Sequence, residues 1–224
     1  MVTSEELNMT FQKVGNDFGI DTKAEFAAFR DLKIKWMRSY RWAEFAVSDF
    51  LKDAPMEVIE NIARSIFLRI KGNENDYSDE TVEWLTSTEF AVINQPTYIS
   101  RDLRIGAEEG EHKSIEESLD RLKDKRLIPE DLGMTKIFWS RESKDNKSAW
   151  SSMLMKVITI NSALDSDDVP DDVLDFVILR QITHINMDFK MNNEDRREAV
   201  LEATQSYPGF DSIQEWLAIH GYAE

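Results

Sequence analysis

Residues 170–189 constrain the fold of this chain more than any other segment. Pro170 suits the first turn of a helix, and Asp171 and Asp172 follow it where acidic side chains favour the helix macrodipole. Apolar residues then recur at helical spacing over a broad face: Leu174, Val177, Ile178, Ile182 and Ile185. Such a face is typical of a buried helix. The segment therefore predicts the core helix of the C-terminal half.

The composition excludes several classes of protein. The chain has 224 residues, of which 42% are hydrophobic, with 8 Gly and 5 Pro, and this balance is typical of a folded globular protein. A formal net charge of −16 disfavours general binding to nucleic acid. The absence of cysteine excludes disulfides, Cys-ligated zinc and thiol nucleophiles, so any metal must be held by His, Asp and Glu.

The sequence gives no signal for a membrane. Residues 1–6 lack the charged and then apolar pattern of a signal peptide, and an apolar run such as 176–179 is far shorter than the ~18 residues that span a bilayer. We therefore expect a cytoplasmic protein without a membrane partner.

The N-terminal part, residues 1–105, is expected to be mainly helical within an α+β fold. Helical signals dominate from about Thr22 to Ile99. One helix is predicted by apolar residues at spacings of three and four before Gly72, namely Val58, Ile59, Ile62, Ile66 and Ile70. A second is predicted from Asp79 to Ile93 and ends before Pro96.

The C-terminal part, residues 112–224, mixes strands and helices. A surface helix is predicted over 114–127, and strands are predicted over 135–139 and 150–160, where β-branched and aromatic residues replace the helical period. The core helix follows, and then two further helices, over 194–204 and 211–220. The sequence does not fix the boundary between the two parts, so two domains and one compact unit both remain open.

The core helix carries a family resemblance. The segment Val169-Pro170-Asp171-Asp172-Val173-Leu174, continued to Arg180-Gln181-Ile182-Thr183-His184, resembles the active-site helix of zincin metallopeptidases, notably the SprT-like and YgjP-like metal-dependent hydrolases and their archaeal relatives. The flanks agree, because a strand ending at Asn161 precedes it and Tyr207-Pro208 and Trp216-Leu217 follow. The resemblance covers about residues 135–221 and implies a zincin-like C-terminal domain.

In that family an HExxH motif places two histidines one helical turn apart on one zinc ion, and its glutamate acts as general base. The resemblance puts Arg180 at the first histidine, Gln181 at the glutamate and His184 at the second histidine. A guanidinium has no lone pair for zinc, and a carboxamide is no base near neutral pH. The third ligand corresponds to Asp195, with Glu198 and Glu202 as alternatives. This motif is degenerate, and the expected cofactor is none or weakly bound zinc.

Loss of two chemical positions in one motif predicts a pseudoenzyme that keeps a cleft for an extended peptide or protein. The strand over 151–160 is the candidate binding edge, through Met153, Met155, Val157 and Thr159. Arg180 is expected either to replace the charge of the metal, paired with Asp195, Glu198 or Glu202, or to reach solvent at the rim of the cleft.

Two alternatives remain open. One is a metal-dependent hydrolase that uses His184, Asp195 and a further carboxylate. The other is a nucleic-acid-associated protein like the SprT-like relatives, because five bases and several aromatic residues alternate between Arg30 and Trp42 against one acid, Asp31. The simpler interpretation of that run is a helix-to-strand segment whose Trp side chains pack inward. This simpler interpretation is preferred to nucleic-acid binding, because the chain as a whole is acidic.

Overall fold

The computed structural model describes residues 1–73, 76–142, 146–190 and 192–222. The chain divides into two compact units, Met1–Glu89 and Phe90–Glu224, so the division falls earlier than the expected boundary between 105 and 112. Both units combine helices with a three-stranded sheet, in agreement with the predicted α+β class.

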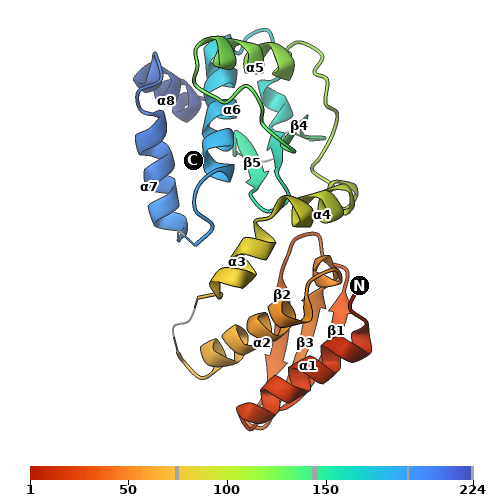
Figure 1. Cartoon of the computed structure of the whole chain (residues 1–224). Coiled ribbons are helices and arrows are strands. Elements are labelled where there is room, and N and C mark those ends of the chain that lie inside the picture. Colours follow the sequence, from red (N-terminus) through yellow and green to blue (C-terminus); the bar gives the residue numbers. More distant parts are fainter. Residues whose placement is uncertain (74–75, 143–145, 191, 223–224) are drawn as a thin grey trace. The chain divides into compact units, whose positions relative to one another are not determined.

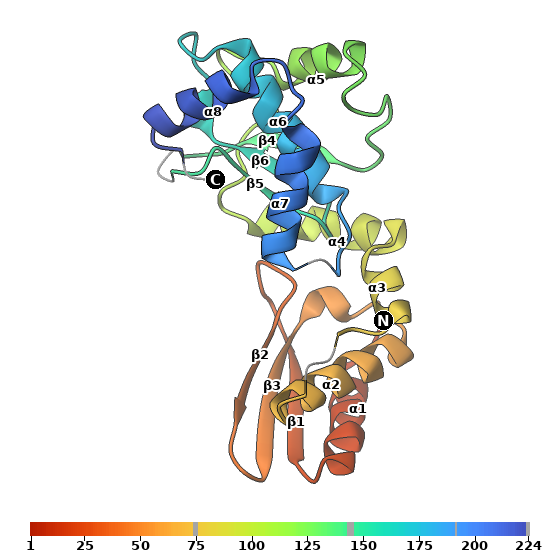
Figure 2. The same ribbon diagram turned by 90° about the vertical axis from the view of Figure 1, so that its left-hand side faces the viewer.

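The first unit packs two helices on one face of a sheet. Helix α1 (Ser4–Asp17) and helix α2 (Met56–Ile70) lie on the same side of strands β1 (Asp21–Ala27), β2 (Ile34–Arg38) and β3 (Trp42–Ser48), as Figure 2 shows. The strand order is β1-β3-β2, with β1 parallel and β2 antiparallel to β3.

The core of this unit lies between the sheet and the helices. The ring of Phe45 on β3 packs against Phe11 of α1 at 5.0 Å and Phe67 of α2 at 5.3 Å between centroids. The opposite face of the sheet carries exposed Lys23, Glu25 and Glu44. Helical signals were predicted from about Thr22 onward, and this is wrong for residues 22–48, which form strands β1, β2 and β3 and the loops between them.

The next two helices are also displaced from their predicted bounds. Helix α3 (Asp79–Leu85) ends at Thr86, whose hydroxyl donates to the carbonyl of Val82 at 2.8 Å and so competes with continuation of the helix. Helix α4 (Thr88–Arg101) then begins, and Pro96 lies inside it. The prediction of one helix over 79–93 that ends before Pro96 is therefore wrong.

The second unit packs helices against a second sheet (Figure 1). Strands β4 (Lys136–Trp139), β5 (Ala149–Ser152) and β6 (Val157–Ile160) have the order β4-β6-β5. Helices α5 (Ile115–Asp124), α6 (Asp171–Ile185) and α8 (Phe210–Ile219) contribute to one apolar core with Trp139, Ala149, Ile158 and Ile160. Helix α7 (Asn193–Thr204) packs against α6. Buried Gln95 of α4 donates to the carbonyls of Met134 and Met155 and so ties α4 to the loops around the sheet.

The predicted strand over 150–160 is two strands. Residues 153–156 form a tight turn between β5 and β6, and Lys156 has a φ of 52° there. The sequence Met153-Leu154-Met155-Lys156 contains none of the Gly, Pro, Asn or Asp residues that usually mark a turn, so hydrophobic content concealed it.

The two units share a topology. In each sheet the first and third strands are parallel neighbours and the second is the antiparallel outer strand. In each unit a short 3-10 helix follows the third strand, Asp49–Leu51 and Ser162–Leu164. A proline, Pro55 or Pro170, then caps a helix of 15 residues. The outer strands β2 and β5 therefore occupy equivalent positions.

Candidate functional site

The candidate site lies where the polar stripe of α6 faces strand β5. Residues 173–179 of α6 are buried, and the helix becomes partly exposed from Arg180 onward at Gln181, Thr183 and His184. Position 180 and position 184 are one helical turn apart and thus share a face. That face is directed toward β5 by two side-chain hydrogen bonds.

The two hydrogen bonds join α6 to serines at and just before β5. Nη2 of Arg180 donates to Oγ of Ser148 at 2.8 Å. Nδ1 of His184 lies 3.0 Å from Oγ of Ser151. Ser151 begins the stretch predicted as the binding edge, but sequence reasoning gave neither serine a contact with α6, because no motif marks a hydroxyl that lies 32 or 33 residues from its partner.

Burial and neighbouring arginines lower the pKa values of both side chains at this site. Burial, with a smaller contribution from the charge of Arg197, lowers the pKa of Arg180 to about 10, so its guanidinium is still charged at pH 7. Burial also lowers the pKa of His184, with added repulsion from Arg196 and Arg180. Because an ordinary histidine titrates near 6.5, His184 is a neutral imidazole at pH 7, with one nitrogen able to donate and the other to accept.

The predicted carboxylate ligands lie on the surface of α7. Asp195, Glu198 and Glu202 are exposed, and the carboxylate of Asp195 accepts a hydrogen bond from Nδ2 of Asn192 at 2.8 Å. Within residues 1–73, 76–142, 146–190 and 192–222, no group of three or more His, Cys, Asp or Glu side chains could hold a metal ion. The structure thus does not gather His184 and these carboxylates into such a group.

The predicted binding edge needs a correction. Val157 and Thr159 lie on β6, the central strand of its sheet, and both are buried. Met153 and Met155 lie in the turn, and Met155 is 1% exposed. None of these four residues is therefore on an outer strand.

The antiparallel outer strand is β5, and its register shows which backbone groups point outward. The amide of Asn161 donates to the carbonyl of Ser148, so Ser148 and Asn161 are a hydrogen-bonded pair. In an antiparallel ladder such pairs alternate with non-bonded ones. Since Ala149 pairs with Ile160 and Ser151 with Ile158, the N–H and C=O groups of Ala149 and Ser151 point away from β6.

The other strand that could be an edge, β4, is covered. The amide of Gly106 donates to the carbonyl of Trp139, and the amide of Trp139 donates to the carbonyl of Ala107, each at 2.8 Å. These bonds add the segment around residues 105–107 to β4. Among the residues that the structure describes, no backbone hydrogen bond covers β5 in this way, so β5 is the open edge of the sheet, next to Arg180 and His184.

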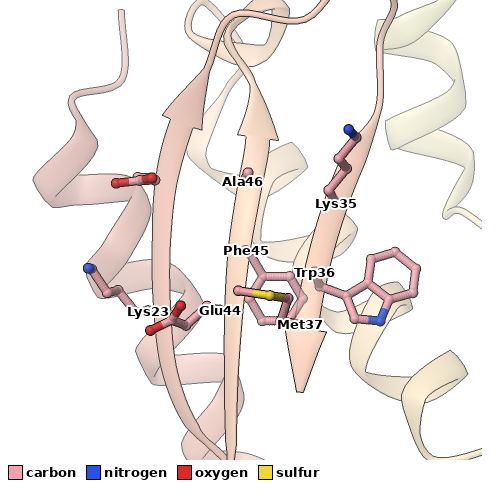
Figure 3. A pocket seen from close by; sticks show the side chains of 8 residues that line it. Lys23, Lys35, Trp36, Met37, Glu44, Phe45 and Ala46 are labelled. Carbon is pink, nitrogen blue, oxygen red and sulfur yellow. The ribbon is translucent and has the colours of Figure 1, made fainter.

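The basic run is a second candidate surface, in the first unit. Residues 34–38 form β2, and every residue from 35 to 42 is exposed. Trp36 is 45% exposed and Trp42 is 42% exposed, so the prediction that the tryptophans pack inward is wrong. Beside this strand, the exposed sheet face has a hollow of about 290 Å³ above Ala46, flanked by Lys23, Glu25, Lys35 and Glu44 (Figure 3).

Comparisons with known proteins leave the site to be interpreted from its own chemistry. No protein-family model matches the sequence, and neither curated proteins nor solved structures give a significant match. Among the helices of the described residues, none combines the length and apolar character needed to cross a bilayer.

Proposed function

We propose that the second unit is a zincin-like module without a working metallopeptidase centre, and that it binds an extended peptide along β5. The observation that carries this proposal is the pair of contacts Arg180–Ser148 and His184–Ser151, which aligns one face of α6 with the open edge of the sheet. The motif positions and the candidate binding strand thus adjoin each other.

The side chains at the motif positions support loss of hydrolysis. Arg180 carries only donors and Gln181 has no basic group, so neither replaces a zinc ligand or a general base. His184 alone supplies a nitrogen ligand, and catalytic zinc sites use three protein ligands. Water activation therefore has neither a metal of ordinary affinity nor a base at these positions.

The backbone of β5 supports peptide binding. An added strand would hydrogen-bond the outward N–H and C=O groups of Ala149 and Ser151, and such bonds give affinity with little dependence on sequence. The neighbouring side chains Ser151 and Trp150 are partly exposed, so a ligand strand can reach them. Specificity would then come from the groups beside the edge, Arg180 and His184 among them.

A proline at position 151 tests the edge selectively. The amide of Ser151 points away from β6, so Ser151→Pro removes an outward donor and leaves the β5–β6 ladder intact. Ser151→Ala is the matched control, because it also removes the hydroxyl near His184 but keeps the amide. Circular dichroism and thermal melting check that both variants fold.

The probe is fluorescein-labelled casein, an unfolded polypeptide that offers many extended segments. We expect binding by the parent without hydrolysis, a loss of about fivefold or more in affinity for Ser151→Pro, and little change for Ser151→Ala. The β5 site would be refuted if folded Ser151→Pro binds casein as tightly as the parent does. It would also be refuted if none of the three proteins binds casein. Stoichiometric zinc in the purified protein together with casein hydrolysis would instead support the metal-dependent hydrolase.

A further inference from the structure

Strand β2 and the turn that leads from it into β3 are rich in exposed apolar side chains. Within the described residues, 12 large hydrophobic side chains are exposed, and four of them fall between positions 36 and 42: Trp36 at 45%, Met37 at 64%, Tyr40 at 99% and Trp42 at 42%. Charge at an edge protects against aggregation, and β2 carries Lys35 and Arg38, but such protection does not need exposed aromatic residues. Clustered exposed aromatic residues instead indicate an interaction surface.

The same segment is strongly basic in an acidic chain. Residues 30–42 contain Arg30, Lys33, Lys35, Arg38 and Arg41 against the single acid Asp31, whereas the whole chain has a net charge of −16. Asp31 forms an ion pair with Arg30 at 3.0 Å, so it does not neutralise the bases nearer β2. Charge complementarity therefore favours an acidic partner.

The register of β2 shows that its backbone can accept another strand. The amide of Ser39 donates to the carbonyl of Trp42, and the amide of Ser48 donates to the carbonyl of Lys33. Because hydrogen-bonded and non-bonded pairs alternate along the ladder, Lys35–Ala46 and Met37–Glu44 are hydrogen-bonded pairs. The N–H and C=O groups of Ile34, Trp36 and Arg38 point outward, away from β3.

Each face of β2 offers a base and at least one apolar side chain. Lys35 and Met37 lie on the open face of the sheet, while Trp36 and Arg38 lie on the other face. In Figure 3 the indole of Trp36 extends past the outer edge of β2, and Met37 lies over β3. A strand placed beside β2 would meet a cation and an apolar group on both of its faces.

We propose that β2 is a docking edge for an extended acidic peptide that also carries apolar residues. The peptide adds a strand to the sheet, its carboxylates face Lys35 and Arg38, and its apolar side chains contact Trp36 and Met37. Main-chain hydrogen bonds supply affinity, and the alternating side chains supply selectivity. This surface is independent of the β5 site, although β2 and β5 hold equivalent positions in their units.

Two other occupants fit the edge less well. A second copy paired through β2 would bring two basic strands together, and like charges placed opposite each other are unfavourable. Single-stranded nucleic acid needs aromatic side chains on one platform. Trp36 shares a face with Phe45, whereas Trp42 precedes buried Ala43 and so lies on the opposite face.

The experiment uses the full chain and a fluorescein-labelled peptide of repeating Glu-Glu-Val-Val, whose strand presents acids and valines on both faces. Fluorescence anisotropy at low and high salt measures its affinity. A Lys-Lys-Val-Val peptide tests charge, an acidic peptide with prolines at alternate positions tests strand addition, and oligo-dT tests nucleic acid. Lys35→Glu and Trp36→Ala alter the edge, and Lys71→Glu is the charge-matched control at an exposed position just after α2.

We expect only the Glu-Glu-Val-Val peptide to bind, more weakly at high salt and about tenfold more weakly to Lys35→Glu, with no change for Lys71→Glu. Trp36→Ala should weaken binding at both salt concentrations. The proposal is overturned if the acidic peptide does not bind, if the proline-containing peptide binds equally well, or if Lys35→Glu leaves its affinity unchanged. Binding of oligo-dT in place of the peptide would assign the surface to nucleic acid.

Discussion

Nδ1 of His184 on α6 lies 3.0 Å from Oγ of Ser151 on the outer strand β5. This contact joins the position that the zincin resemblance assigns to a second histidine to the edge strand of the sheet. Because Arg180 makes the corresponding contact with Ser148 one turn earlier, the helix and the edge form one surface.

The first prediction concerns the pH dependence of stability. Burial, with repulsion from Arg196 and Arg180, lowers the pKa of His184 in the folded protein. Below about pH 6.5 the unfolded chain therefore binds a proton that the folded chain resists, and the free energy of unfolding falls by up to about 1.4 kcal/mol per pH unit until the folded pKa is reached. Urea unfolding at pH 7.5 and at lower pH measures this slope.

The variant His184→Asn should flatten that slope, because it removes the titrating ring and keeps a polar group near Ser151. The control variant His112→Asn should keep the slope of the parent protein, because His112 is exposed and pairs with Asp167 on the surface. An unchanged slope in His184→Asn would show that other groups control the acid sensitivity.

A second prediction concerns the buried carboxylate that joins α5 to α6. Asp175 is 1% exposed at its side chain, and Arg121 donates to both of its oxygens at 2.7–3.1 Å. Arg121→Met removes the hydrogen bonds to this buried carboxylate and leaves it, among the described side chains, only the ammonium group of Lys125, at 3.6 Å, so the free energy of unfolding should fall by about 1.5–3 kcal/mol. Chemical denaturation measures the loss.

The matched control is Arg64→Met, which removes an exposed arginine paired with Asp17 and Glu60. Exposed pairs contribute about 0–1 kcal/mol, so this variant should remain close to the parent. Similar losses for the two variants would mean that the α5–α6 pair is effectively solvated.

A third prediction tests the segment that covers the edge of β4. A Cβ at Gly106 would lie 2.8 Å from the carbonyl oxygen of Trp139 and 3.0 Å from the amide nitrogen of Arg141. Both are backbone atoms that cannot turn aside, so Gly106→Ala should cost about 1–3 kcal/mol and loosen the segment. Hydrogen exchange at the amides of Gly106 and Trp139 should then be faster.

Gly133→Asn provides the comparison for that variant. Gly133 has a φ of 59°, which Asn tolerates, and its Cβ would meet nothing within 4 Å. It should cost less than about 1 kcal/mol. If Gly106→Ala is as stable as Gly133→Asn, the close packing of residues 105–107 on β4 is not required.

Much of the second unit could be predicted from its sequence. The core helix expected from Pro170 is α6, and the apolar residues that predicted it are buried. The helices expected over 194–204 and 211–220 are α7 and α8 within one residue at each end. Wide apolar faces and helix-start signals are local features, so they can be read from the sequence.

The sheet of the first unit was not predicted because the periodicity of its residues favours a strand while their composition favours a helix. Thr22 and Ala24 alternate with exposed Lys23 and Glu25, which is the period of a strand. Alanine, lysine and glutamate are also strong helix formers, so composition favoured a helix. Tertiary contacts of Phe45 with Phe11 and Phe67 decide the outcome, and these are not local.

The candidate site was only partly predictable for a similar reason. Helical spacing places positions 180 and 184 on one face, and the structure directs that face toward β5. The choice of β5 depends on a turn at 153–156 without turn residues and on the order of three strands. Neither property is encoded in a short motif.

The central claim is that positions 180, 181 and 184 correspond to the zinc-binding motif of zincins. The most direct test is zinc titration calorimetry on the double variant Arg180→His with Gln181→Glu. The contacts of Arg180 and His184 with neighbouring serines support a shared face, so two imidazoles there should raise zinc affinity over the parent by about tenfold or more. Adding His184→Ala to the double variant should abolish the gain. A double variant that binds zinc no better than the parent, or that binds equally well without His184, would contradict the zincin-like account.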